Sequence, residues 1–221
     1  MKTRAFLTFF FLFAVLTTQA QWRWRSQFSD HIYFAQDFTL QFSNLSKLNS
    51  GIAPGTTGFN EQLEWLGLSY GTIMTSRRYV YDGLIYFSQL NRQHLASSDS
   101  LNFTLNGYRF GINAGHDLFS KTNWFDLNTT WGFSYNRLSL REYSTASAGK
   151  YINPALLVDL KLDAHLALRL GKLLRLFIGV RPGYSFDISS GKWKRKTEML
   201  PGIPKTRLGG PEVSVFIGFG S

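Results

Sequence analysis

The chain of 221 residues contains no cysteine and only four histidines, and after its first twenty residues it has no apolar run long enough for a transmembrane helix. The lack of cysteine excludes disulfides, thiolate metal sites, thiol catalysis and a lipoprotein anchor. The histidines lack the paired spacing of a metal site, and no phosphate-binding loop or nucleophile elbow occurs. These absences exclude a helical membrane protein and argue against metal and nucleotide enzymes. The four histidines are His31, His94, His116 and His165.

The first twenty residues have the pattern of a secretory signal peptide. Lys2 and Arg4 form a basic start, residues 5–16 are apolar, and Thr18-Gln19-Ala20 is a small-residue cleavage site. Twelve apolar residues are too few to span a bilayer. We therefore predict a signal peptide over residues 1–20, a periplasmic N-terminal segment over 21–30 and one β-barrel domain over 31–221.

The chain is basic, with 24 Lys and Arg against 14 Asp and Glu. Removing Lys2 and Arg4 with the signal leaves 22 basic and 14 acidic residues, a net charge of +8. In an exported protein this charge favours anionic lipid, glycan or protein as partners and argues against nucleic acid.

Residues 156–170 alternate almost without error. Leucine, valine and alanine fill one face, while the other carries five ionisable side chains among its seven residues. Successive strand residues point to opposite faces. An aliphatic face this long beside so many charges is typical of a strand with hydrocarbon outside and polar packing inside.

Eight such strands are predicted, at about residues 31–43, 62–74, 79–90, 101–118, 124–138, 156–170, 173–187 and 212–220. In the fourth strand, the apolar residues Phe103 and Leu105 fall on one face, and Tyr108, Phe110 and Ile112 fall on the opposite face. This change of phase predicts a β-bulge near Gly107.

The connections between these strands alternate in length. Those after the second, fourth and sixth strands are short, whereas residues 44–61, 91–100, 139–153 and 188–211 form long polar segments. Outer-membrane barrels have short periplasmic turns and long extracellular loops. The sequence therefore predicts an all-β, eight-stranded antiparallel transmembrane β-barrel in the bacterial outer membrane. A secreted β-sandwich is the alternative, and it would not show this regularity.

Inward-facing positions carry charges that should pair across a narrow lumen, because buried charges need partners. For Arg169 and Arg175 we expect at least one ion pair with a lumen carboxylate, and Asp159 and Glu212 are the candidates. Inward glycines are expected to leave room for the arginines. The predicted lumen network comprises Asp159, Lys161, Asp163, His165, Arg169, Arg175, Arg181 and Glu212, with Arg109 a further inward charge.

Catalysis is not predicted. Eight-stranded deacylases that edit lipid A use a His-x-Ser pair, but Ala167 follows His165 and Leu118 follows His116 at that spacing. Asp163 and His165 share a face and could still form a general base. A hydrogen-bond network in the lumen is the preferred interpretation, and no cofactor or metal is expected.

The segment 188–211 carries six basic residues against Glu198, a net charge of +5. Lys192, Lys194, Arg195 and Lys196 cluster there and predict a contact with lipopolysaccharide phosphates or an acidic partner. The alternative is a solvated loop that is merely basic. Expected partners are outer-membrane lipid, lipopolysaccharide and a membrane or secretion-complex protein.

Four segments together resemble the small outer-membrane barrels of Bacteroidota, of PorT-like, OmpA- and OmpX-like style. They are the Ala20-Gln21 junction, residues 151–157, residues 179–184 and the closing residues 210–220. The resemblance implies an integral outer-membrane barrel without one shared activity, and some members assist type IX secretion. The predicted role is a non-enzymatic one, structural, adhesive or complex-forming, through extracellular loops. The alternatives are a secretion-accessory barrel, a narrow channel and, last, a lipid-modifying enzyme.

Overall fold

A computed structural model describes residues 31–52, 58–75, 80–96, 102–118, 124–143, 148–171, 174–195, 198–199 and 203–220. The predicted signal peptide and the periplasmic segment 21–30 lie outside these residues. Within them, no helix is both long and apolar enough to cross a membrane.

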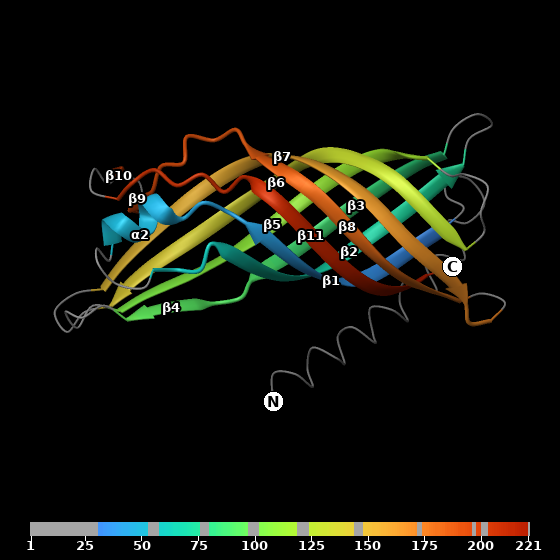
Figure 1. Cartoon of the computed structure of the whole chain (residues 1–221), viewed down its shortest axis with the longest axis horizontal. Coiled ribbons are helices and arrows are strands. Elements are labelled where there is room, and N and C mark those ends of the chain that lie inside the picture. Colours follow the sequence, from blue (N-terminus) through green and yellow to red (C-terminus); the bar gives the residue numbers. More distant parts are fainter. Residues whose placement is uncertain are drawn as a thin grey trace.

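The described part of the chain is almost entirely β-structure (Figure 1). Its elements are β1 (His31–Phe42), α2 (Ser46–Ile52), β2 (Gln62–Thr75), β3 (Val80–Leu90), β4 (Gln93–Ala96), β5 (Asn102–Asp117), β6 (Phe125–Tyr143), β7 (Ala148–Arg169), β8 (Arg175–Asp187), β9 (Lys194–Arg195), β10 (Glu198–Met199) and β11 (Gly210–Gly220). The eight long strands match the eight predicted ones, while α2, β4, β9 and β10 lie in segments that were predicted as loops.

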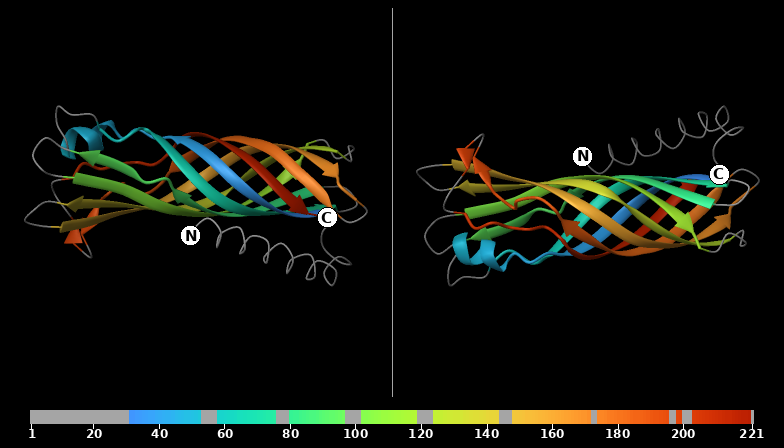
Figure 2. Two further views of the ribbon diagram at one scale, coloured as in Figure 1. Left: turned by 90° about the horizontal axis from the view of Figure 1, so that it is seen from below. Right: turned by 90° about the horizontal axis from the view of Figure 1, so that it is seen from above.

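The eight long strands form a closed antiparallel ring in the order β1-β2-β3-β5-β6-β7-β8-β11 (Figure 2). Closure comes from the first and last strands, which pair continuously from Tyr33 with Gly220 to Gln41 with Glu212. The predicted fold class, an eight-stranded antiparallel barrel, is confirmed. The short elements α2, β4, β9 and β10 gather at one end, the capped end, and the other is the short-turn end.

Alternation along the strands places apolar side chains outside and polar ones inside over most of the barrel. On β7, Leu156 and Leu160 are 44% and 54% exposed, while Asp159 between them is fully buried. The outer surface also carries Trp131, which is 61% exposed. Exposed bulky apolar side chains of this kind are what a hydrocarbon environment requires.

Toward the capped end this polarity reverses within single strands. On β6, outward Phe133 and Tyr135 give way to Arg137 and Arg141, and the inward side changes from polar to the fully buried Leu138 and Leu140. A polar outside around an apolar inside is the pattern of a barrel surrounded by water. The capped end is therefore built as a water-surrounded extension of the same sheet.

The reversal explains why the bulge prediction was wrong. Asn106, Gly107 and Tyr108 pair without interruption with Ser139, Leu138 and Arg137. Phe103 and Leu105 face inward, into the apolar interior of the capped end, at 6% and 0% exposure. The apolar residues change face because the surroundings of the strand change, and the register of β5 with β6 is continuous. On the other edge of β5, the pairing shifts by one residue between Gln89 with Tyr108 and Gln93 with Leu105, so the extra residue opposite Gly107 lies on the β3–β4 side and not in β5.

The segment 139–153 was also predicted wrongly as a loop. β6 extends to Tyr143 and β7 begins at Ala148, so that most of this segment is a protruding hairpin. Its alternation was missed because its inner face is apolar and its outer face polar, the opposite of the strands below it.

The inward glycines make room for tyrosines. A Cβ atom on Gly71 would overlap the ring of Tyr33, and one on Gly111 would overlap the ring of Tyr86. In each case the tyrosine is the glycine's cross-strand partner. Covering a strand glycine with a neighbouring aromatic ring stabilises a curved sheet. The expectation that these glycines accommodate arginines therefore needs correction at Gly71 and Gly111.

Candidate functional site

The middle of the lumen holds a compact ionic group, the Arg109 cluster. Nη2 of Arg109 lies 2.7 Å from Oδ1 of Asp159, and Nη1 lies 2.5 Å from Oε2 of Glu212. Lys161 completes the group, with Nζ 2.8 Å from Oε1 of Glu212. Two cations thus face two carboxylates, and each charge has an opposite partner, as burial requires.

Neutral side chains complete the surroundings of the Arg109 cluster. The hydroxyl of Tyr86 donates a hydrogen bond to Oδ2 of Asp159. Nη2 of Arg109 donates to Oγ of Ser185 over 2.9 Å. The Tyr86 ring centroid lies 4.2 Å from Nζ of Lys161, within cation–π range.

A second ionic group, the Arg181 cluster, lies nearer the short-turn end. Arg181 places Nη1 2.5 Å from Oδ1 of Asp37 and Nε 2.5 Å from Oδ2 of Asp163. Its Nη2 donates to the hydroxyl of Tyr33 over 3.0 Å, and its guanidinium carbon lies 3.6 Å from the centroid of Phe216. Salt bridge, hydrogen bond and stacking together hold this arginine in one place.

His165 extends the Arg181 cluster. Its Nδ1 lies 2.9 Å from Oδ1 of Asp163, and its Nε2 lies 3.2 Å from Oδ2 of Asp126. The ring is 1% exposed and lies against the rings of Tyr33, Phe177 and Phe216. A histidine enclosed in this way can hold two carboxylates, and its own ring is almost fully buried.

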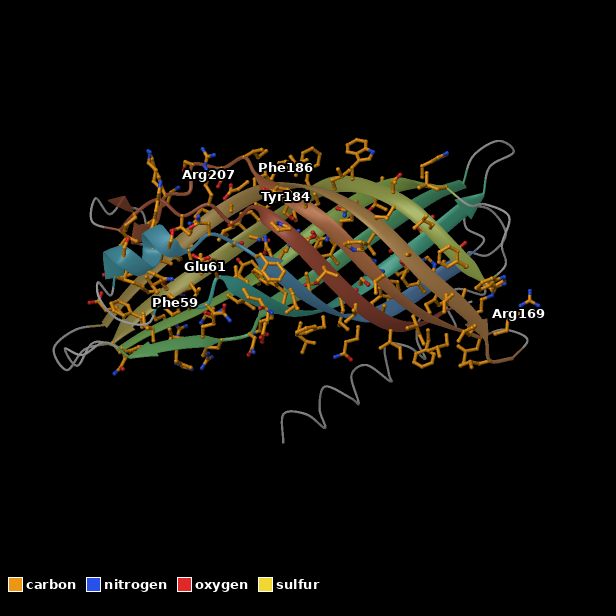
Figure 3. All side chains as sticks on the ribbon, viewed as in Figure 1. Phe59, Glu61, Arg169, Tyr184, Phe186 and Arg207 are labelled. Atoms are coloured by element: carbon orange, nitrogen blue, oxygen red, sulfur yellow. The ribbon has the colours of Figure 1, made fainter. Side chains whose placement is uncertain are left out.

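Six of the eight residues predicted for the lumen network belong to these two clusters, which we call the charged layer: Asp159, Lys161, Asp163, His165, Arg181 and Glu212. Arg169 and Arg175 lie elsewhere. They are opposite each other in the register of β7 and β8 at the short-turn end, and Arg169 points away from the barrel (Figure 3). Arg169 is ten positions from Asp159 along β7, roughly 33 Å. The expected ion pair with Asp159 is therefore too distant.

Sequence reasoning missed Asp37, Tyr33 and Tyr86. Asp37 could have been predicted, because it is next to the outward-facing Phe38 on β1 and must therefore face the lumen. The tyrosines were not, because a tyrosine suits a lipid interface as well as a polar lumen.

Above the charged layer the lumen is filled by a second region, which we call the apolar plug. Trp65 and Trp193 are each 1% exposed there. A cavity among residues of the charged layer and Trp65 has a volume of about 10 Å³, room for about one water molecule. The apolar plug consists of Leu45, Leu48, Phe59, Leu63, Trp65, Leu90, Leu95, Phe103, Leu105, Leu138, Leu140, Ala155, Leu157, Trp193 and Leu208.

The described residues of the segment 188–211 are folded into the mouth of the barrel. The indole of Trp193 donates to Oγ1 of Thr206 over 3.0 Å, and Nδ2 of Asn153 donates to the carbonyl of Thr206 over 2.9 Å. Oδ2 of Asp187 accepts the backbone N–H of Leu208 over 2.7 Å. These contacts hold the described part of the segment against the barrel, while the anion contact of its basic residues stays a prediction.

The four predicted anion-contact residues are placed only in part. Lys192 and Lys194 are half-buried on either side of the enclosed Trp193. Arg195 belongs to β9, but its side chain lies outside the described residues, as does all of Lys196. Among the described residues, no group of three His, Asp or Glu side chains has the geometry of a metal site.

Comparison with known proteins identifies the fold. A scan against family models and a search of curated proteins found no match. Among solved structures, a major outer membrane protein from Thermus thermophilus is similar, with a TM-score of 0.51, 12% identity and coverage of 86% of this chain and 98% of that one. The chain therefore has the fold of a small outer-membrane β-barrel.

Two further structures cover similar shares at lower TM-scores. Ail of Yersinia pestis, in complex with the heparin analogue sucrose octasulfate, gives 0.47 with 9% identity, 88% of this chain and 97% of Ail. Neisserial surface protein A gives 0.42 with 12% identity, 86% of this chain and 94% of that one.

Proposed function

We propose that the protein is an outer-membrane barrel with a closed lumen and a non-enzymatic role, structural, adhesive or complex-forming, performed by its capped end. We infer that residues 1–20 are a signal peptide, that residues 21–30 lie in the periplasm and that the exposed apolar outer surface lies in the outer membrane. The fold and the exposed apolar side chains support the last of these three placements.

The filled lumen is the observation on which the proposal rests. The charged layer holds Arg109 and Arg181 at 1% and 2% exposure, each between two carboxylates. The apolar plug lies above it, with Leu138 and Leu140 fully buried. A channel needs a wet path past both regions, and an enzyme in the lumen needs a path for substrate to His165. Neither alternative is supported, so the surface is the part left for function.

Conductance in planar bilayers tests the closed lumen. The folded full chain should insert without producing current steps, while an open porin in the same bilayer conducts. Steady conductance by the parent chain would overturn the proposal and favour the narrow channel.

Site-specific photo-crosslinking in native membranes tests the role of the capped end. A crosslinking amino acid at Lys47, Arg92 or Lys205, all exposed there, should give adducts with macromolecules. The same probe at Leu170, at the short-turn end, serves as the comparison. Adducts restricted to Leu170 would contradict the proposal and place the partner in the periplasm. Adducts with secretion components would favour the PorT-like role, which stays a prediction.

A further inference from the structure

Four cations lie together on the outer face of the sheet, just beyond the level at which its polarity reverses. Arg137 and Arg141 come from β6, Lys150 from β7 and Lys194 from β9. Arg141 and Lys150 are exposed, and Arg137 and Lys194 are partly exposed. We call these four residues the rim cluster.

The strand register brings these side chains close together on one face. Arg141 and Lys150 are direct cross-strand partners, so that their Cβ atoms lie about 5 Å apart. Lys194 is the partner of Ile152, two residues along β7 from Lys150, which places it on a diagonal of roughly 7–8 Å. Trp193, the neighbour of Lys194, points the opposite way, into the apolar plug. Lys150 therefore lies between Arg141 on one side of β7 and Lys194 on the other, and the three cations share one outward patch of the sheet.

Nothing in the described part of the chain neutralises this patch. Like charges directly opposite each other destabilise a sheet, yet Arg141, Lys150 and Lys194 make no ion pair with any described carboxylate. The nearest acid on β6, Glu142, has the opposite parity and accepts a hydrogen bond from the Tyr151 hydroxyl over 2.8 Å. An anion from outside the chain would relieve the repulsion.

The position of the rim cluster indicates which anion this is. Arg137 donates to the Tyr108 hydroxyl over 3.1 Å, and its guanidinium carbon lies 5.8 Å from the ring centroid. Tyr108 lies 6.5 Å from Tyr135, and both rings are exposed on the outer face. Aromatic rings mark the interface level of a membrane barrel. The cations thus stand where lipid headgroups begin.

We propose that Arg137, Arg141, Lys150 and Lys194 form a binding site for the phosphate group of an anionic lipid in the surrounding membrane leaflet. Arg137 fixes the level through Tyr108, and the other three supply the charge. The proposal deepens the proposed function, because it rests on the barrel lying in the membrane with its capped end outside. It differs from the contact predicted for residues 192–196, since three of its four cations come from the β6–β7 hairpin.

The test uses the folded full chain in phosphatidylcholine vesicles that contain lipid A, dephosphorylated lipid A or neither, with lipid A binding followed by a fluorescent analogue. Each basic residue near an anionic membrane strengthens attraction about fivefold. Changing Arg141, Lys150 and Lys194 together to Ser should weaken lipid A binding by roughly 100-fold. Dephosphorylated lipid A should bind weakly to parent and variant alike.

A charge-matched variant separates the site from net charge. Lys47, Arg92 and Lys205 are exposed cations elsewhere at the capped end, and changing all three to Ser removes the same charge. This control should bind lipid A within about threefold of the parent, because attraction falls with distance from the membrane. The exchange R141K with K150R should also retain binding, since it keeps both charges in place.

A stability measurement covers the case in which the triple variant binds poorly because it misfolds. Without lipid A, the triple variant should unfold at the same or higher urea concentration than the parent, since a cross-strand repulsion is gone. With lipid A, only the parent and the charge-matched control should become more stable.

Three results would overturn the site. They are equal lipid A binding by parent and triple variant, equal loss in the charge-matched control, and competition of inorganic phosphate as strong as that of lipid A. Two other results would contradict the proposed function and not the lipid site. These are conductance by the parent chain and failure of the parent to insert into phosphatidylcholine vesicles.

Discussion

The charged layer and the apolar plug fill the same lumen with opposite chemistry. The charged layer lies where the outer surface is apolar, as at Trp131 and Phe133, and the apolar plug lies where it is polar, as at Arg141. The apolar face of a strand must lie against other apolar groups. Around the charged layer these groups are outside the barrel, and around the apolar plug they are the side chains inside it. The surroundings of a strand therefore decide which of its faces is the inner one.

The largest effect is expected from breaking the charged layer. R109A removes the shared partner of Asp159 and Glu212 and leaves two buried carboxylates with less compensation. Losing one partner of a buried ion pair costs about 3–5 kcal/mol in free energy of unfolding. Urea unfolding in lipid vesicles should show this loss. The double variant R109M with E212Q should recover part of it, because a neutral pair needs no counter-charge. A loss below about 1 kcal/mol, the range of a solvent-exposed ion pair, would indicate a wet lumen.

The apolar plug should respond locally. L140A empties space at a fully buried position and should cost about 2–5 kcal/mol. Trp193 and Leu208 of the segment 188–211 belong to the apolar plug. The loss of stability should therefore appear first as faster hydrogen exchange and proteolysis in this segment. L140M keeps the volume and should cost under about 1.5 kcal/mol. Equal protection of that segment in all three proteins would show that the plug does not hold the cap.

The reversal of polarity along β6 can be located with a lysine scan. W131K places a charge on the apolar outer face and should destabilise the barrel by about 2–4 kcal/mol in lipid vesicles. Y143K changes an outward residue beyond the reversal and should fall within about 0.5 kcal/mol of the parent, as surface substitutions do. Similar losses for both would place the whole length of β6 in hydrocarbon.

The smallest effect is expected at the packed glycines below the plug. G71A would force a methyl group into the ring of Tyr33, and overpacking of this kind costs about 1–3 kcal/mol. Gly171 has no atom within 4 Å of an added Cβ, so that G171A is the matched control and should leave the urea midpoint unchanged. If G71A behaves like G171A, the ring of Tyr33 moves aside and does not hold Arg181.

Strand number and most of the inward charges followed from the sequence, because period-two alternation is a local property of the chain. The run from Leu156 to Leu170 needs no partner to reveal its two faces. The same reasoning located Asp159, Lys161, Asp163, Arg181 and Glu212 in the lumen. It went wrong at Phe103 and Leu105, where it assumed that an apolar face always turns outward.

Which charges meet, and where the inside of the barrel becomes apolar, depended on the assembled barrel. Asp159 and Arg109 are 50 positions apart in the chain, and Arg181 and Asp37 are 144 apart. Their contact depends on ring closure and stagger, which no strand encodes alone. Alternation in the sequence was enough to establish that each strand has two faces. Closure of the ring and the packing of the described residues of segment 188–211 in its mouth determined what each inner face meets.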